Sequence, residues 1–167
     1  MDELTQKEIK DKLRNLDNLS TEEIKELLRL QLKLHKSAGL PKKEVDAMLR
    51  KTPKERYIYS VKRIAQEEEA WTLKNKDGII ATGDDDGNTF FPVWPNKEYA
   101  LKCIAGEWKN CELKKLPLDN LLKEILPNLS KEGTKVSLFI VPDDPVSVTA
   151  TADDFLNNLL YECDKYE

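Results

Sequence analysis

The densest group of carboxylates in the chain lies at residues 83–88, which read Gly-Asp-Asp-Asp-Gly-Asn. Clustered carboxylates favour Ca²⁺, and an EF-hand loop has an acid at position one, glycine at position six and glutamate at position twelve. With Gly87 at position six, position one is Thr82 and position twelve is Val93. The segment therefore does not fit a calcium loop, and its turn-forming residues predict a polar turn between two strands.

Histidine and cysteine are too sparse for the common nucleophilic and zinc sites. His35 is the single histidine, and its position in a Leu-Lys-Leu-His-Lys context predicts a helix surface. A zinc site needs three or four ligands at suitable spacing, which His35 and the scattered Cys103, Cys111 and Cys163 do not offer. The six glycines stand singly, so no phosphate-binding loop is present. We expect no catalytic residues of these types, no metal and no cofactor.

Paired carboxylates leave one catalytic alternative open. Glu67, Glu68 and Glu69 are consecutive, as are Asp153 and Asp154. Two carboxylates can act as general acid and base, so an uncharacterised enzyme with a carboxylate site remains an alternative. Asp153 and Asp154 also fall at the expected start of the last helix, where acids favour the helix dipole. A solvated helix end is the simpler interpretation.

The charges are unevenly distributed along the chain. Residues 1–51 hold 12 Lys and Arg against 10 Asp and Glu, whereas residues 52–167 hold 15 against 21. The second part therefore carries a net charge of −6, which attracts basic partners and repels phosphate backbones. The acids that we expect to contact a partner are Asp84, Asp85, Asp86, Asp143, Asp144, Asp153, Asp154, Glu162 and Asp164.

A nucleic-acid alternative rests on the first part of the chain. Residues 37–45 resemble a helix-turn-helix connection, with Lys42, Lys43 and Arg50 as candidate phosphate contacts. Glu44 and Asp46 stand in the same supposed recognition helix and oppose this reading. A DNA- or RNA-associated regulator that uses the N-terminal helices is therefore kept as an alternative.

Apolar spacing and capping residues predict helices at both ends of the chain. Capping boxes at Ser20 and Thr52 open two helices, and a third begins at Thr151 with Asp154 three residues on. A short helix is predicted from Asp119 to Leu126, closed by Pro127. The helix after Thr52 follows a spacing close to 3.6 residues through Tyr57, Ile58, Val61, Ile64 and Ala65. The last helix is expected to bury Phe155, Leu156, Leu159, Leu160 and Cys163.

Between these helices the apolar period changes to that of strands. Residues 71–73, 79–81 and 90–94 are separated by two turn-rich segments and predict a three-stranded antiparallel meander. Further strands are expected at residues 111–116 and 134–141, the latter paired with residues 146–149 in a hairpin. The fold class is α+β, with a mainly antiparallel sheet of about five to six strands, packed helices and a small N-terminal helical segment. We expect a helical extension at residues 1–42 and an α+β domain at residues 43–167.

Several short motifs are similar to a known bacterial family. They are Arg56-Tyr57 followed by Trp71; Asp84-Asp85-Asp86-Gly87-Asn88; Pro92-Val93-Trp94-Pro95-Asn96-Lys97-Glu98-Tyr99-Ala100; Gly106-Glu107-Trp108; and Leu118-Asp119-Asn120-Leu121-Leu122. In these motifs the chain resembles the family catalogued as domain of unknown function 2750, from about Lys43 to Glu167. Ile125-Leu126-Pro127 departs from the Trp-Leu-Pro expected there. The resemblance implies a small α+β domain and no assigned activity.

These observations favour a binding protein over a catalyst. We expect a non-enzymatic cytoplasmic protein-binding module, because the chain has neither an apolar run of membrane-spanning length nor a leader-like start, and its cysteine pattern favours reduced thiols. The partner is expected to be a basic protein. The most specific version is an immunity protein that neutralises a nuclease-type toxin through the acidic surface. The oligomeric state stays open.

Overall fold

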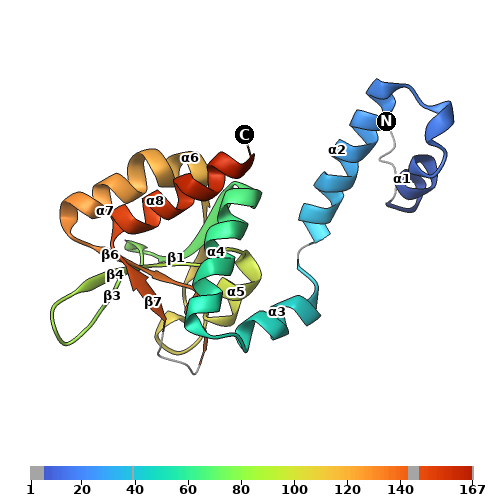
Figure 1. The fold of residues 1–167 in the computed structure, drawn as a ribbon. Helices are drawn as coiled ribbons and strands as arrows, with labels where there is room; N and C mark the ends of the chain where they lie inside the picture. The colour runs from blue at the N-terminus through green and yellow to red at the C-terminus, as the bar shows by residue number, and fades with distance from the viewer. Residues whose placement is uncertain (1–5, 39, 143–146, 167) are drawn as a thin grey trace. The chain divides into compact units, whose positions relative to one another are not determined.

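The computed structural model describes residues 6–38, 40–142 and 147–166 (Figure 1). Contacts within the chain divide it into two compact units, Met1–Lys42 and Lys43–Glu167. In the described residues no helix combines the length and the apolar character that crossing a bilayer requires.

The described residues of the first unit form three helical segments. They are α1 (Gln6–Leu13), the short 3₁₀ helix η1 (Leu16–Asn18) and α2 (Thr21–Ala38). Ile9 on α1 and Leu27 on α2 are buried, because the two helices pack against each other. The capping box at Ser20 is confirmed: Ser20 N–H donates to Glu23 Oε2 at 2.7 Å, and Glu23 N–H donates to Ser20 Oγ at 3.3 Å.

The second unit contains the remaining helices. They are α3 (Lys42–Leu49), α4 (Pro53–Glu67), α5 (Lys97–Lys102), η2 (Gly106–Trp108), α6 (Leu118–Asn120), η3 (Leu121–Ile125), α7 (Leu126–Glu132), α8 (Ala152–Cys163) and η4 (Asp164–Tyr166). Thr52 caps α4 with the predicted reciprocal bonds to Glu55, and Thr151 Oγ1 accepts from Asp154 N–H at 3.1 Å to open α8.

The prediction that Pro127 closes a helix is wrong. The segments α6, η3 and α7 follow one another without a break to Glu132, and the helix ends at Gly133 with φ +70°. η3 is a π-helical turn in which Leu126 N–H donates to Leu121 O, five residues back. Such a widened turn accommodates the proline, which cannot donate a backbone hydrogen bond.

In the part of the chain that the structure describes, seven short strands form two sheets. The first contains β1 (Glu69–Asn75), β2 (Gly78–Ile79) and β5 (Glu112–Pro117) in the order β2-β1-β5, and both of its pairings are antiparallel. The second contains β3 (Thr82–Gly83), β4 (Thr89–Val93), β6 (Lys135–Leu138) and β7 (Val148–Ala150) in the order β3-β4-β6-β7. Here β4 and β6 are parallel and the other two pairings are antiparallel. Trp71 and Trp94 join the sheets through two backbone hydrogen bonds of 2.8 Å.

The α+β class and the hairpin between β6 and β7 are confirmed, whereas the expected meander is wrong. β1 takes β5 as its long partner, and the segments expected to be the second and third strands of the meander belong to different sheets. Each turn-rich segment does form a local antiparallel pair, β1 with β2 and β3 with β4. The β1–β5 and β4–β6 pairs bring together segments about 40 residues apart in the sequence. Turn-forming residues predict only pairs of strands that follow one another closely, so they do not predict these two.

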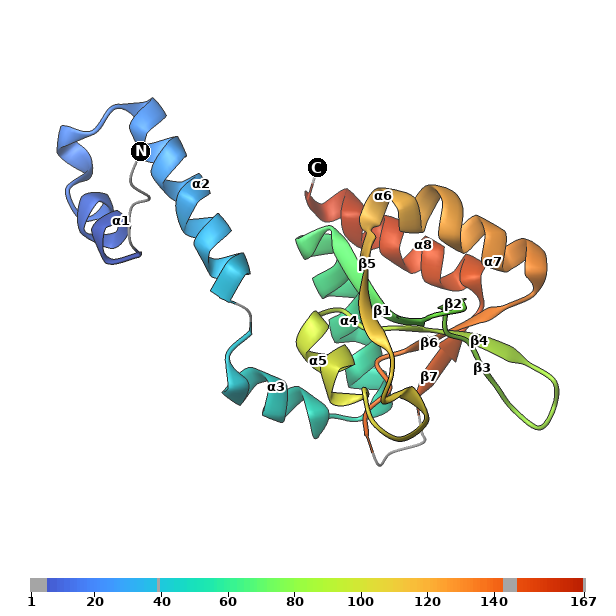
Figure 2. The same ribbon diagram turned by 180° about the vertical axis from the view of Figure 1, so that it is seen from behind.

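The main core lies between helices and strands of the second unit. α7 and α8 lie side by side over the strands, with α4 beside α8, while α5 packs against β1 and β5 (Figures 1 and 2). The core residues include Val61, Ile64, Phe91, Val93, Leu121, Leu126, Val136, Leu138, Phe155 and Leu159. Two residues of the predicted apolar patterns are exposed: Ile58 is 45% exposed and Leu160 is 44% exposed. Tyr57, Leu156 and Cys163 are partly buried.

The three cysteines are not joined in disulfides. Cys103 is buried, and its Sγ donates to Ile140 O at 3.2 Å, while Cys111 and Cys163 are partly exposed. Burial raises the pKa of Cys103 to about 11. The buried thiol is therefore held protonated at neutral pH.

Candidate functional site

The predicted acidic residues fall in three separate places. Asp84, Asp85 and Asp86 lie in the turn between β3 and β4, and Asp153, Asp154, Glu162 and Asp164 lie on or directly after α8. Asp143 and Asp144 lie outside the described residues. The acids therefore do not form one continuous cluster.

Asp84 has a structural role in its turn. Its Oδ1 accepts from Asp86 N–H at 3.0 Å and Asn88 N–H at 2.9 Å, and its Oδ2 accepts from Asn88 Nδ2 at 2.9 Å. The bonds from Asn88 hold the pKa of the Asp84 carboxylate below its usual value. Gly87 supplies the positive φ of +83° that this turn requires. Asp85 and Asp86 are exposed.

An acidic ridge runs along one exposed line of α8. Asp153, Asn157, Leu160 and Asp164 follow one another at helical spacing, and all four are exposed. This ridge places the 44%-exposed apolar side chain of Leu160 between carboxylates near the two ends of the helix. Glu162, by contrast, is buried and forms an ion pair with Lys165 at 3.1 Å.

A groove lies between α4 and a second face of α8, next to the acidic ridge. It has a volume of about 190 Å³ and is lined by Tyr57, Ile58, Val61, Asn158, Tyr161 and Glu162. Asn158 Nδ2 donates to Tyr57 Oη across it. Burial raises the pKa of Tyr57, with a smaller contribution from the Asp154 carboxylate. The groove is lined by both apolar and polar side chains.

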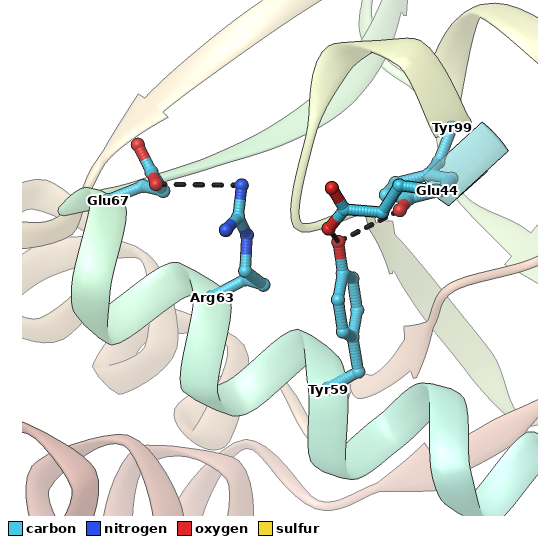
Figure 3. Close-up of polar contacts among 5 residues, drawn as sticks. All are labelled: Glu44, Tyr59, Arg63, Glu67 and Tyr99. Atoms are coloured by element: carbon cyan, nitrogen blue, oxygen red, sulfur yellow. Dashed lines mark hydrogen bonds and ion pairs between the residues drawn. The ribbon is translucent and has the colours of Figure 1, made fainter. Parts of the chain in front are cut away.

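A second polar arrangement, the tyrosine cluster, connects α3, α4 and α5 (Figure 3). It comprises Glu44, Tyr59, Arg63, Glu67 and Tyr99. Tyr59 Oη donates to Glu44 Oε1 at 3.1 Å and lies 2.8 Å from Tyr99 Oη. Because the single hydroxyl proton of Tyr59 is used by Glu44, Tyr99 must be the donor to Tyr59. The carboxylate is the terminal acceptor of a two-bond chain.

Arg63 forms the other half of the cluster. Its Cζ lies 5.9 Å from the centroid of the Tyr59 ring, and its Nη2 lies 3.5 Å from Glu67 Oε1. Its Nε is buried and has no hydrogen-bond partner among the described residues. These are the contacts of a cation that packs on an aromatic face and forms a loose ion pair.

The cluster lies next to a strained residue at the end of β6. Phe139 has φ +56°, an uncommon conformation for an aromatic residue, and it is fully buried. Its N–H donates to Val93 O at 2.9 Å, and its ring lies 4.4 Å from that of Tyr99, centroid to centroid. Packing and this hydrogen bond hold the unusual backbone in place.

The chemistry that this cluster can perform is limited by its pKa values. Burial raises the pKa of Tyr59 and raises that of Tyr99 to about 12. Both phenols are therefore protonated at neutral pH and act as hydrogen-bonding groups rather than as phenolate bases. The contacts are those of a polar network that fixes α3 and α5 to α4.

The carboxylates at residues 67–69 are distributed over two elements. Glu67 ends α4 and pairs with Arg63, while Glu69 begins β1 and pairs with Lys115 across the β1–β5 ladder at 2.8 Å. Glu68 lies between them in a left-handed conformation with φ +59°. Each of the two outer carboxylates thus has its own cation.

The helix α3, which the nucleic-acid alternative treats as a recognition helix, has both exposed and bound side chains. Lys42, Lys43 and Arg50 are exposed, whereas Val45 is buried and Glu44 is bound to Tyr59. Glu44 therefore connects α3 to α4. The side chain of His35 lies outside the described part of α2. In the described residues no three His, Cys, Asp or Glu side chains lie close enough to hold a metal ion.

Sequence reasoning missed the residues that the structure brings together most closely. Tyr59, Arg63 and Glu67 repeat every four residues on α4, a polar stripe visible in the sequence, but their partner Tyr99 lies 40 residues away. On α8, Tyr161 is 68% exposed beside the core residue Leu159. In the sequence, Tyr161 stands apart from the apolar residues that α8 buries, and such an exposed aromatic residue could have indicated the groove.

Comparison with known families identifies the second unit. The model of the family described as "Protein of unknown function (DUF2750)" matches residues 57–159, which is more than half of the chain. The matched part begins within α4 and ends within α8, so it includes Tyr57, Ile58, Val61 and Asn158 of the groove but not Tyr161 or Glu162. No curated protein shows significant similarity to the chain. The chain belongs to the DUF2750 family.

Proposed function

We propose that this chain is a non-enzymatic protein-binding module whose contact surface includes the acidic ridge of α8. The observation that carries the proposal is the arrangement of Asp153, Leu160 and Asp164 on one exposed line of the helix. Protein contact surfaces commonly combine an apolar anchor with a charged, solvent-accessible rim. The ridge has this composition within one short element.

The sign of the charge indicates the partner. Residues 52–167 carry 21 acids against 15 bases, and the exposed ridge has no cation among its four residues. Such a surface accelerates the encounter with a basic protein and disfavours an acidic one. A basic, nuclease-type toxin is the most specific partner class with this property, which makes an immunity protein the sharpest form of the proposal.

The test is co-purification of the tagged full chain, co-expressed with the genes adjacent to its own. We expect a basic neighbour-encoded protein to co-elute. The variant Asp153→Asn/Asp164→Asn is expected to weaken its binding about tenfold, because neutral isosteric side chains remove the rim charges without changing their size.

The matched control is Glu107→Gln/Glu112→Gln, which removes two exposed acids outside α8 and should leave binding unchanged. Thermal unfolding of each variant verifies that it is folded. The proposal is wrong if no basic neighbour-encoded protein binds, or if the α8 variant and the control bind equally well.

A further inference from the structure

The groove between α4 and α8 is a surface that the acidic ridge does not use. Its volume of about 190 Å³ is below the roughly 300–1,000 Å³ of most small-molecule sites. It spans about one turn of each helix, from Tyr57 to Val61 and from Asn158 to Glu162. The groove therefore suits one or two side chains of another protein surface rather than a cofactor or metabolite.

Two exposed apolar side chains stand at this groove. Ile58 is 45% exposed on α4, and Tyr161 is 68% exposed on α8. Lys165 Nζ lies 4.7 Å from the centroid of the Tyr161 ring and 3.1 Å from Glu162 Oε1. This contact holds the exposed ring in place, so that little side-chain entropy is lost when a partner covers it.

Beyond the Glu162–Lys165 pair, exposed charges of opposite sign flank the groove on its two helices. Lys54 and Lys62 lie four residues on either side of Ile58 and are exposed on the same face of α4. The nearby Glu55 carboxylate is turned back to accept from Thr52 N–H. On α8, Asp154 lies one turn before Asn158 and is exposed. The surface thus carries charges of both signs, unlike the acidic ridge.

A surface that carries opposite charges on two neighbouring helices can be complementary to itself. α4 and α8 lie side by side and run in the same general direction (Figures 1 and 2). Lys54, one turn before Tyr57, and Asp154, one turn before Asn158, are therefore at the same end of the groove. If α4 of one copy faced α4 of another, lysines would oppose lysines. A two-fold axis along the helices instead places α4 opposite α8 and Lys54 opposite Asp154.

We propose that this groove is the interface of an isologous homodimer, in which α4 of each protomer packs on α8 of its partner. Ile58 and Tyr161 form the apolar centre, and Lys54 of each protomer pairs with Asp154 of the partner subunit. Since each protomer contributes only about one turn of each helix, the interface is at the small end of protein contacts, and the dimer is weak and concentration-dependent.

The experiment is sedimentation velocity on the full chain between about 10 μM and about 1 mM, the range in which a small interface dissociates. We expect a monomer–dimer equilibrium in the wild type. Lys54→Glu and Asp154→Lys should each weaken dimerisation about tenfold, because every pair occurs twice in a two-fold dimer. The double variant Lys54→Glu/Asp154→Lys restores the pairing with reversed signs and should dimerise like the wild type.

Ile58→Asp should abolish the dimer in this range, because it buries a charge at the apolar centre. Leu101→Asp is the matched control: Leu101 is 50% exposed on α5, and its replacement should leave the dimer unchanged. A wild type that stays monomeric overturns the proposal. So does a dimer that survives Ile58→Asp, or a double variant that fails to recover. None of these variants alters Asp153 or Asp164, so failure here leaves the proposed partner binding standing.

Discussion

Replacing Tyr59 by phenylalanine should destabilise the protein more than the same replacement at Tyr99, because the two phenols have different positions in one hydrogen-bond chain. Tyr99 donates to Tyr59 at 2.8 Å, and Tyr59 donates to Glu44 at 3.1 Å. Tyr99→Phe removes only the first bond and leaves Tyr59 paired with the carboxylate. Such a loss costs about 1 kcal/mol of unfolding free energy.

Tyr59→Phe removes both bonds and leaves the hydroxyl of the fully buried Tyr99 without its acceptor. Two net hydrogen bonds and one unsatisfied buried donor together amount to about 3 kcal/mol. The double variant loses both bonds but has no unsatisfied donor, so its cost is about 2 kcal/mol. The double variant should therefore cost about 2 kcal/mol less than the two single variants added together.

Equilibrium unfolding in urea measures all three values by linear extrapolation. Glu44→Gln serves as a control, since it keeps an acceptor oxygen for Tyr59 and should cost less than Tyr59→Phe. The proposed direction of the chain is refuted if Tyr99→Phe costs as much as Tyr59→Phe. Additive costs in the double variant would contradict it as well.

Two further predictions concern the cap of α4 and the unfolding free energy at alkaline pH. Thr52→Ala removes the acceptor of Glu55 N–H at the start of α4 and should cost about 1 kcal/mol in urea unfolding; an unchanged midpoint would contradict this role. The pKa of Tyr99 is raised to about 12, so its contribution is fully present below the ordinary tyrosine pKa of about 10 and is lost as the pH rises through about 12. Between pH values of about 9 and 11, wild type should therefore lose more unfolding free energy than Tyr99→Phe, and equal losses would argue against the raised pKa.

Local chemistry explains what could be predicted from the sequence. The side chains that cap α2, α4 and α8 act within three residues of themselves, so Ser20, Thr52 and Thr151 were sufficient signals. The alternation within residues 134–141 likewise predicted the strand that forms as β6, and its antiparallel pairing with β7. Strand order depends on longer contacts. The β1–β5 ladder and the parallel β4–β6 pair leave no local trace, which is why a meander was expected in their place.

For the candidate surfaces too, features set by neighbouring residues could be predicted, whereas features set by tertiary packing could not. The acids of α8 could be predicted as helix-start and helix-end residues, but their separation from residues 84–86 could not. Exposure of Leu160 and Ile58 escaped prediction, because each lies at the edge of an apolar stripe whose limits are set by the packing of α4 on α8. Apolar spacing alone does not show where a neighbouring helix stops covering a face.

The central claim is that an acidic surface on α8 binds a basic protein, and the association rate constant tests it most directly. The rate should be measured for the full chain and its neighbour-encoded basic partner at low and physiological ionic strength. Electrostatic steering predicts a rate for the wild type that falls steeply with salt, and a lower, flatter dependence for Asp153→Asn/Asp164→Asn. A wild-type rate that is insensitive to salt, or a variant that keeps the full salt dependence, would contradict a role for the acidic ridge in recognition.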